Sequence, residues 1–303
     1  MSSILTALLV VANRYRESRL APADERCLDA YAAAGVYGAA GVPFEIVEPR
    51  LPEAERADFE PDNLGRLGGK IATAVAGAYR HGRSVLMTGG DCNHLTGMIG
   101  GLQDAFGPTA KIGLVWFDAH GDFNTPNTTI SGMLGGMPVA VAAGLAYPRW
   151  REWSHIAAPL PTDRIVMVDV RNLDPAEETL VRATDVTIAR VAPGFYGDVA
   201  LETAVNRLAA NCDLIYFHID SDILDEAYVP NHHTREPDGP GMAEVKAAIE
   251  TVMATGKVAA FGVVSVFGGG PAEQRARSVE SGCELIETGL KAWATHGRPS
   301  VGG

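Results

Sequence analysis

Short apolar runs rich in β-branched residues recur along this chain, and segments with a helical spacing of apolar residues separate most of them. Runs of this length suit strands, and strands that alternate with helices favour a parallel sheet covered by helices. The alternation therefore predicts an α/β fold. We expect strands at Ile4–Val11, Phe44–Val47, Ser84–Met87, Ile112–Phe117, Arg164–Val168, Leu214–His218 and Val258–Val266.

Neither an internal repeat nor a long linker interrupts this alternation, so we expect one α/β domain over residues 1–303. Residues 124–137 and 225–241 fit neither pattern, and we expect loops there. Long loops after strands are where open α/β sheets carry their sites. The expected helices are Ala23–Ala34, Asn63–His81, Leu95–Phe106, Pro175–Ala183, Val199–Ala209, Met242–Thr255 and Arg277–Trp293.

Composition argues against several classes of protein. The net charge is −12 and the basic residues form no cluster, which argues against nucleic acid as a partner. The longest apolar stretches fall short of the roughly 20 residues that cross a bilayer, and the N-terminus lacks the basic start of a secretory signal. We therefore expect a cytoplasmic protein without a membrane span. The four cysteines show no spacing typical of zinc sites or disulfide frameworks.

Acidic residues and histidines follow two of the expected strands. Asp118, His120 and Asp122 come after one strand and would share a face if the chain stayed extended. Asp220 and Asp222 follow another, where His218 would join them. Four carboxylates brought together would repel one another, whereas two divalent ions such as Mn²⁺, about 3.5–4 Å apart, would neutralise them. Each pattern taken alone also suits a solvated strand end, a helix cap or an ordinary turn.

A third strand is followed by the segment Gly89-Gly90-Asp91-Cys92-Asn93-His94. A glycine pair permits a turn that is closed to residues with side chains, and the helix start that follows could present Cys92 or His94 to a site. Taken alone this signal is weak, because an isolated cysteine is more often a small buried residue.

Together, and in this order, the three segments resemble the arginase and agmatinase, or ureohydrolase, superfamily, with its Gly-Gly-Asp-His, Asp-Ala-His-x-Asp and Asp-x-Asp-x-x-Asp motifs. The similarity runs from about Ser84 to Glu287 and is strongest over residues 118–126 and 131–138. It implies a three-layer α/β/α fold with a mostly parallel sheet, and a dimanganese centre that activates water for attack on a guanidinium carbon. It also implies catalytic roles for Asp122, as general base, and His120. The implied metal ligands are Cys92, Asp118, His120, Asp122, Asp220 and Asp222.

Three positions depart from the family pattern. Cys92 replaces a histidine ligand, which favours softer ions such as Zn²⁺ or Ni²⁺ and leaves open whether one or two ions bind. Gly135 replaces the histidine thought to shuttle protons, and Ser265 replaces the glutamate that grips the guanidinium. Candidates to refill the proton role are His94, His232 and His233, although an ordinary exposed histidine is the expectation for each.

The family's residues at the other end of the implied pocket, where the amino-acid head of the substrate binds, are largely retained in this sequence. Asn124, Thr129, Ser131 and Asp174 match positions that bind the amino-acid head of the substrate, while Met133 replaces an asparagine of that set. For Asp174, a plain helix cap before Pro175 is an equal alternative.

These features predict a metal-dependent hydrolase of a linear C–N bond in a guanidino or amidino compound with an amino-acid-like head. Because Ser265 cannot pair bidentately with a planar cation, we expect a modified or less basic group rather than arginine itself. The family resemblance also links cysteine at position 92 to modified-arginine metabolism and implies a homo-oligomer, a trimer or hexamer. The alternative is a non-catalytic member of the family with a structural or regulatory role.

Overall fold

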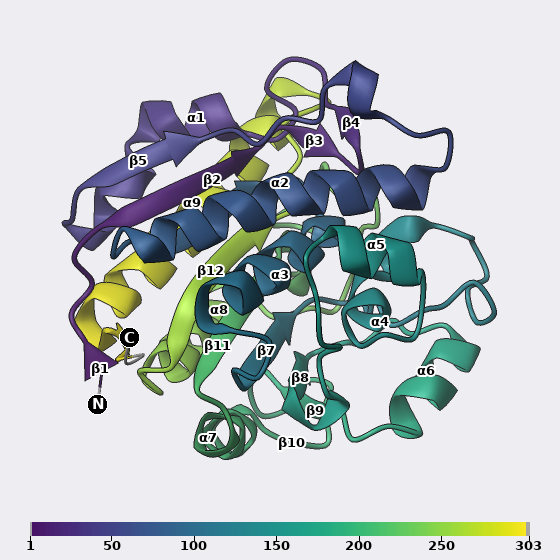
Figure 1. Cartoon of the computed structure of the whole chain (residues 1–303). Helices are drawn as coiled ribbons and strands as arrows, with labels where there is room; N and C mark the ends of the chain where they lie inside the picture. The colour runs from purple at the N-terminus through teal and green to yellow at the C-terminus, as the bar shows by residue number, and fades with distance from the viewer. Residues whose placement is uncertain (1, 301–303) are drawn as a thin grey trace.

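The computed structural model describes residues 2–300 and has at its centre a sheet of nine strands, in the order β10-β9-β8-β7-β11-β12-β6-β2-β5. Every neighbouring pair in this sheet is parallel. Figure 1 shows the sheet running through the molecule between two layers of helices. Its strands are β2 (Leu8–Asn13), β5 (Phe44–Val47), β6 (Ser84–Gly89), β7 (Ile112–Phe117), β8 (Ile165–Val168), β9 (Thr187–Arg190), β10 (Val199–Ala200), β11 (Leu214–Asp220) and β12 (Val258–Val264).

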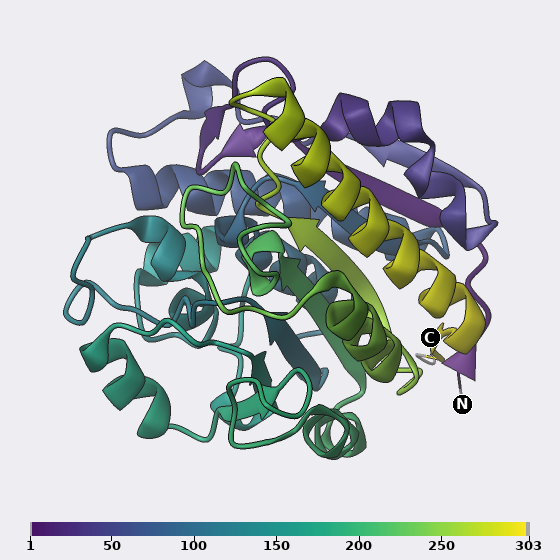
Figure 2. The same ribbon diagram turned by 180° about the vertical axis from the view of Figure 1, so that it is seen from behind.

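Helices cover both faces of this sheet, which confirms the predicted three-layer α/β/α fold. One face carries α2 (Glu60–Arg80), α3 (Leu95–Phe106), α4 (Pro138–Ala142) and α5 (Pro148–Trp153). Figure 2 shows the opposite face, covered by α1 (Leu28–Ala34), α7 (Leu201–Asn211), α8 (Met242–Met253) and α9 (Ala272–His296). The remaining helix is α6 (Pro175–Arg182). Two short antiparallel pairs join β1 (Ser2–Ser3) to β13 (Arg298–Pro299) and β3 (Tyr15–Arg16) to β4 (Arg19–Leu20).

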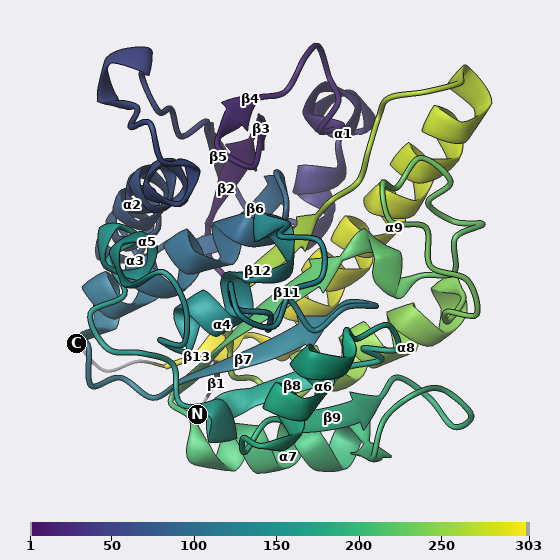
Figure 3. The same cartoon turned by 90° about the vertical axis from the view of Figure 1, so that its right-hand side faces the viewer.

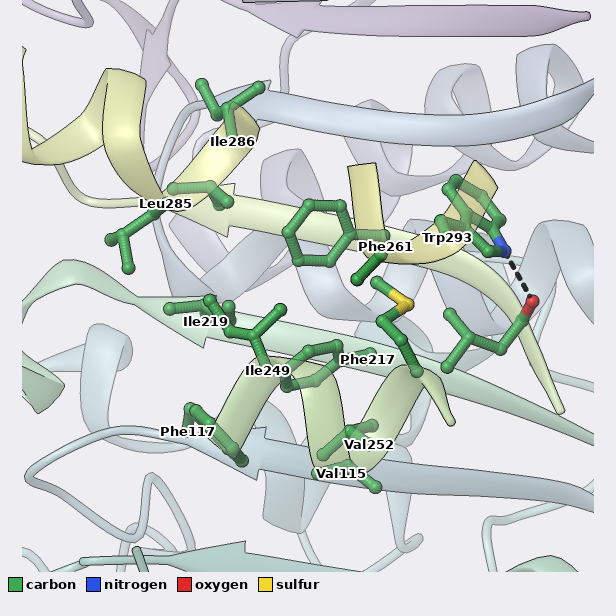
Figure 4. Close-up of a cluster of buried hydrophobic side chains, with 14 of the residues drawn as sticks. Val115, Phe117, Phe217, Ile219, Ile249, Val252, Phe261, Leu285, Ile286 and Trp293 are labelled. Atoms are coloured by element: carbon green, nitrogen blue, oxygen red, sulfur yellow. Dashed lines mark hydrogen bonds between the residues drawn. The ribbon is translucent and has the colours of Figure 1, made fainter. Parts of the chain in front are cut away.

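The sheet separates two hydrophobic cores. Figure 4 shows part of the core beneath α8 and α9, where Phe217 lies near Ile249 of α8 and Phe261 lies near Trp293 of α9. The Trp293 indole donates a hydrogen bond of 2.9 Å to the carbonyl oxygen of Val258, so this large buried ring leaves no polar atom unpaired. The second core packs α2 and α3 onto the other face and contains Trp116. Strands buried on both faces explain the continuous apolar runs in the sequence.

All seven expected strands and all seven expected helices are present, with boundaries shifted by a few residues. The largest shift at a strand is at the first one, which begins at Leu8 rather than Ile4. The predicted helix at Val199–Ala209 begins at Leu201, because its first two residues form β10. Strands β9 and β10 and helices α4 and α5 were not predicted; all four are short. Among the described residues, no helix combines the length and hydrophobicity needed to span a bilayer.

Four neighbouring strands, β7, β11, β12 and β6, place their carboxyl ends side by side (Figure 3). Each is followed by one of the segments singled out in the sequence: Asp118 follows β7, Asp222 follows β11, Ser265 follows β12, and Cys92 follows β6. Because parallel strands end at the same edge of a sheet, these segments lie close together there.

Candidate metal centre

The turn after β6 positions Cys92. Gly89 and Gly90 both have left-handed backbones, with φ of 69° and 68°, and a Cβ on Gly90 would lie 2.7 Å from Nδ1 of His94. Asp91 then caps a short 3₁₀ helix over Cys92–His94 by accepting a hydrogen bond from the backbone N–H of Asn93. Cys92 begins this helix and is 5% exposed. The glycine pair therefore makes the tight turn that the sequence predicted.

The turn after β7 brings together Asp118, His120 and Asp122, but the extended backbone on which their shared face depended is not present. The chain bends directly after Phe117, and Asp118 Oδ1 accepts the backbone N–H of His120 at 2.7 Å. Asp122 has a left-handed backbone with φ of 46°, a conformation that residues with side chains rarely adopt. Local hydrogen bonds, rather than a two-residue period, aim these side chains at one site.

The segment after β11 also turns rather than continuing extended. Asp220 ends the strand, and its Oδ1 accepts the N–H of Asp222 at 3.1 Å to begin a short 3₁₀ helix. Asp222 in turn accepts the N–H of Ala119 at 3.2 Å, which ties the two acidic turns together. Period-two alternation therefore does not explain how Asp220 and Asp222 converge.

Two carboxylates, Asp118 and Asp220, each point one oxygen at a thiol and the other at an imidazole. Their Oδ2 atoms lie 3.5 Å and 2.8 Å from Cys92 Sγ, while Asp118 Oδ1 lies 3.3 Å from His120 Nδ1 and Asp220 Oδ1 lies 3.2 Å from His232 Nε2. Asp122 lies with Cys92 and Asp118 in one group of donors close enough to hold an ion. A carboxylate that faces two donor groups can bridge two ions.

The charges in this cluster are unbalanced without a cation. Burial, together with the neighbouring aspartates, raises the pKa of Asp118 and Asp122 well above the usual range. Burial also raises the pKa of Asp222, but the adjacent His120 and His232 outweigh it and hold this pKa below its usual value. Burial and the same carboxylates raise the pKa of the Cys92 thiol. Divalent cations would relieve this repulsion, so the donor set fits a metal centre.

Carboxylate Glu236 orients the imidazole of His120. His120 Nε2 lies 3.0 Å from Glu236 Oε1, so the ring donates its Nε2–H to Glu236 and turns Nδ1 toward Asp118 and Asp222. A carboxylate that holds the far nitrogen is typical of metal-binding histidines. Sequence analysis missed Glu236 because it lies in the unassigned loop 225–241, where no local pattern pointed to it.

The histidines considered for the proton role differ in their placement. His94 is buried, hydrogen-bonded to Asp91 and Glu17, and does not line the cavity described below. His232 is also buried, so the expectation of an exposed histidine is wrong for both of these residues. His233 is exposed, as expected, and lines the cavity. His218 is fully buried; it contacts Cys92 Sγ at 3.4 Å, and burial lowers its pKa to about 3.

A cavity of about 390 Å³ opens above the acidic cluster. Asn124, Thr129, Ser131 and Asp174, the residues predicted for the substrate head, all line it. Asp174 Oδ2 accepts a hydrogen bond of 3.2 Å from the Asn124 amide, and the Asp174 side chain also caps α6. Both interpretations of Asp174 are thus compatible with its position. Gly135, which offers no side chain, also lines the cavity.

Another part of the cavity wall is formed by two neutral residues, Ser265 and Phe267. Ser265 lines it with a left-handed backbone, φ 58°, and is 4% exposed. Phe267 lies beside it and packs edge-on against His233, with ring centroids 4.1 Å apart. The Arg26 guanidinium covers the Phe267 ring at 4.4 Å. This wall offers no carboxylate at position 265 to a cationic group.

Several known proteins resemble this chain in sequence. The sequence profile of the Arginase family matches residues 33–288. The chain is 29% identical over 256 residues to arginase of Neurospora crassa, an alignment that covers 80% of this chain and 70% of that protein. It is 28% identical over 183 residues to arginase of Bacillus caldovelox, where the alignment spans 60% of each protein.

Solved structures share the fold. Arginase of Bacillus subtilis superposes with a TM-score of 0.80 at 22% identity, covering 94% of this chain and 98% of that one. Arginase of Entamoeba histolytica, in complex with L-ornithine, gives 0.80 at 19% identity over 93% and 99% of the two chains. Formimidoylglutamase of B. subtilis gives 0.67 at 13% identity over 96% and 88%. With the family profile matching most of its length, the chain belongs to the arginase family, whose members are metal-dependent hydrolases acting on amidino and guanidino groups.

Proposed function

We propose that this protein hydrolyses a linear C–N bond in a guanidino or amidino compound that carries an amino-acid-like head and is less basic than arginine. The observation that carries this proposal is the cavity itself, which has a buried cluster of carboxylate, imidazole and thiol donors at one end and Asn124, Thr129, Ser131 and Asp174 at another part of its lining. One part can hold cations that act on the reacting carbon, and the other offers hydrogen bonds to an amino-acid head.

Divalent ions bound by the cluster would polarise the reacting group and lower the pKa of water. Hydrolysis then adds the oxygen of water to the amidino carbon, breaks the bond to the leaving nitrogen and transfers a proton to that nitrogen. We propose that Asp122, which belongs to the same group of donors as Asp118 and Cys92, holds and orients the water as general base. His233, which is exposed and lines the cavity, is the remaining candidate to deliver the proton that Gly135 cannot supply.

The neutral wall of the cavity supports a substrate other than arginine. A guanidinium ion is best recognised by a carboxylate that accepts two parallel hydrogen bonds, and Ser265 offers none. Glu17, Asp91 and Glu177 also line the cavity. Asp91 and Glu177 already accept hydrogen bonds from backbone N–H groups, and burial together with Asp91 raises the pKa of Glu17, which weakens it as a partner for a cation. An N-hydroxyguanidine, a ureido group or an amide carbon depends less on such a grip.

The proposed function also implies which metal ions bind, where the protein is located and how it assembles. We expect two divalent ions per chain, either Mn²⁺ or, because of Cys92, an ion such as Zn²⁺ or Ni²⁺. We also propose a cytoplasmic homo-oligomer, trimeric or hexameric as the family resemblance implies. Metal analysis of the gently purified protein and light scattering after size exclusion measure the ion content and the oligomeric state.

The deciding experiment is a substrate panel with protein reconstituted in Mn²⁺, Zn²⁺ or Ni²⁺. The panel contains arginine, N-hydroxyarginine, citrulline and an N-formimidoyl amino acid, and the assay measures urea, hydroxyurea, ammonia and formamide. We expect turnover of a modified substrate with kcat/KM at least about 100-fold above that for arginine, the loss typical when a buried charge partner is absent. A protein that binds no divalent metal and releases none of these products would instead be a non-catalytic member of the family.

A further inference from the structure

Of the buried histidines without a role in the proposed reaction, His232 is the one that lines the cavity. It lies in the loop 225–241, lines the cavity and is 9% exposed. Its Nε2 atom is fully buried and has no properly directed hydrogen-bond partner, although Asp220 Oδ1 lies 3.2 Å away. A buried ring nitrogen without a partner is costly, so it points to a group that is bound there.

The other ring nitrogen determines what Nε2 can bind. His232 Nδ1 lies 2.7 Å from the carbonyl oxygen of Thr234, which can only accept a hydrogen bond. Nδ1 therefore carries a proton, and Nε2, which faces Asp220, is the nitrogen that can exchange its proton for a metal ion. His120 shows the same arrangement, with its far nitrogen bound to Glu236 and its near nitrogen facing Asp222. This second hydrogen bond is how proteins orient histidines that bind metals.

The donor spacing is that of a coordination sphere. Ligand atoms about 2.0–2.2 Å from one ion lie about 3–3.5 Å apart when they are neighbours around it. Asp220 Oδ1 lies 3.2 Å from His232 Nε2, and His120 Nδ1 lies 3.1 Å from Asp222 Oδ2. Asp220, Asp222 and His232 also form one of the groups of donors that can hold an ion together.

We propose that His232 is a seventh protein ligand of the metal centre, binding through Nε2 the ion that His120 and Asp222 also hold. This inference rests on the proposed metal-dependent function. It makes the two halves of the centre chemically unequal. In one half the group of donors consists of Cys92, Asp118 and Asp122, without an imidazole, whereas the other half has two imidazoles, and Asp118 and Asp220 face both halves.

The unequal halves have a consequence for metal choice. The imidazole that is absent at position 92 is supplied from position 232, on the other side of the bridging carboxylates. Two imidazoles favour borderline ions such as Co²⁺, Ni²⁺ and Zn²⁺ over Mn²⁺, and a thiolate favours the softer ions among them. Both halves of the centre therefore shift the preference away from Mn²⁺.

Cobalt provides a direct test, because a thiolate bound to Co²⁺ adds a charge-transfer band that imidazole and carboxylate ligands do not give. Metal-free full-length protein is titrated with Co²⁺ by calorimetry and absorption spectroscopy. The variants are His232→Gln, its neighbour His233→Gln as matched control, and Cys92→Ser. We expect His232→Gln to weaken one Co²⁺ site at least about 10-fold while keeping the thiolate band. Cys92→Ser should lose the band and retain the other site, and His233→Gln should titrate like the wild type.

A measurement on the unaltered protein keeps the test independent of variant folding. X-ray absorption at the cobalt edge counts the imidazoles bound to the two ions: a total of two supports the proposal, and a total of one overturns it. A His232→Gln titration indistinguishable from the wild type would likewise overturn it. If the wild type binds Co²⁺ through two imidazoles but turns over no substrate in the panel, the proposed hydrolase activity fails while the role of His232 stands.

Discussion

At the scale of single residues, the carboxylate of Asp122 should support activity while destabilising the metal-free protein. It is a buried carboxylate among others, and burial raises its pKa. Asp122→Asn removes one charge, so we expect metal content and turnover to fall, with turnover reduced at least about 100-fold. The metal-free variant should nevertheless melt at a higher temperature than metal-free wild type at pH 8, because a source of repulsion is gone.

Metal analysis, kinetics and thermal denaturation after chelation measure these three effects. Asp104→Asn is the matched control, because Asp104 pairs with His155 at the surface, outside the cavity. Full activity of Asp122→Asn would contradict its assignment as ligand and base.

Cys92 determines which ions one half of the centre accepts. Its thiol must lose a proton to bind a metal, and burial among carboxylates opposes that loss. We expect Cys92→His to raise Mn²⁺ affinity by about 10-fold or more, since a neutral imidazole binds without deprotonation. Calorimetric titration with Mn²⁺ measures the change, and an unchanged affinity would place the thiol outside the coordination sphere.

The sequence predicted which residues converge here, but not how they do so. Asp118, His120 and Asp122 were expected on one face of an extended segment, whereas hydrogen bonds from backbone N–H groups and a left-handed Asp122 aim them instead. His232 escaped assignment as a ligand because it belongs to no spacing pattern. Its position depends on contacts between segments far apart in the sequence, which a local pattern cannot reveal.

At the scale of elements, Arg171 holds the loop that carries His232 and Glu236. Its guanidinium donates to the carbonyl oxygens of Asp222 at 3.0 Å, Glu236 at 3.3 Å and Pro237 at 3.2 Å, and pairs with Asp169 at 2.8 Å. The loop thus has an ordered path without regular secondary structure. Strands and helices could be predicted from periodicity, but an anchor of this kind could not.

We expect Arg171→Lys to destabilise the protein by about 1–3 kcal/mol, because a single ammonium group cannot satisfy all of these acceptors. The affinity for Co²⁺ of the site that contains His120 and His232 should fall as well, since His232 and Glu236 lose their fixed positions. Denaturant unfolding measures the stability, calorimetric titration with Co²⁺ measures the affinity, and hydrogen exchange over residues 222–237 reports on the order of the loop. Arg182→Lys, an exposed arginine paired with Asp198, is the control and should cost less than about 0.5 kcal/mol. Equal costs for the two variants would contradict the anchoring role.

At the scale of the whole molecule, the fold follows from the sequence more completely than the site does. Apolar runs such as Ile112–Phe117 are buried on both faces of the sheet, so their hydrophobicity predicted strands directly. The edge strand β10 and its neighbour β9 are short and only partly buried, and they gave no comparable signal. Buried strands leave apolar patterns in the sequence from which they can be predicted. A site assembled from turns at four strand ends depends instead on tertiary contacts, which leave no local pattern.

The metal-free molecule should lose stability as the pH rises. The folded protein raises the pKa of Asp118 and Asp122 above their unfolded value of 3.8, and of His120 and His232 above 6.5. A group whose pKa is raised by folding stabilises the fold at low pH and loses that contribution as the pH rises through its folded pKa. The lowered pKa of Asp222 acts in the opposite direction, but only below pH 3.8.

The lowered pKa values of His218 and His233 also act in the opposite direction, but only up to about their unfolded value of 6.5. All these terms therefore have the same sign between about pH 7 and 9. We expect the melting temperature of chelator-treated protein to fall across this range, by about 2–4 °C for each kcal/mol lost. Bound divalent ions replace the protons that neutralise the cluster, so the metal-loaded protein should show a smaller decline and a widening advantage at high pH. Thermal denaturation with and without saturating Co²⁺ at each pH measures both curves. Parallel curves would mean that the buried carboxylates do not exchange protons for metal, which would contradict a metal centre at this cluster.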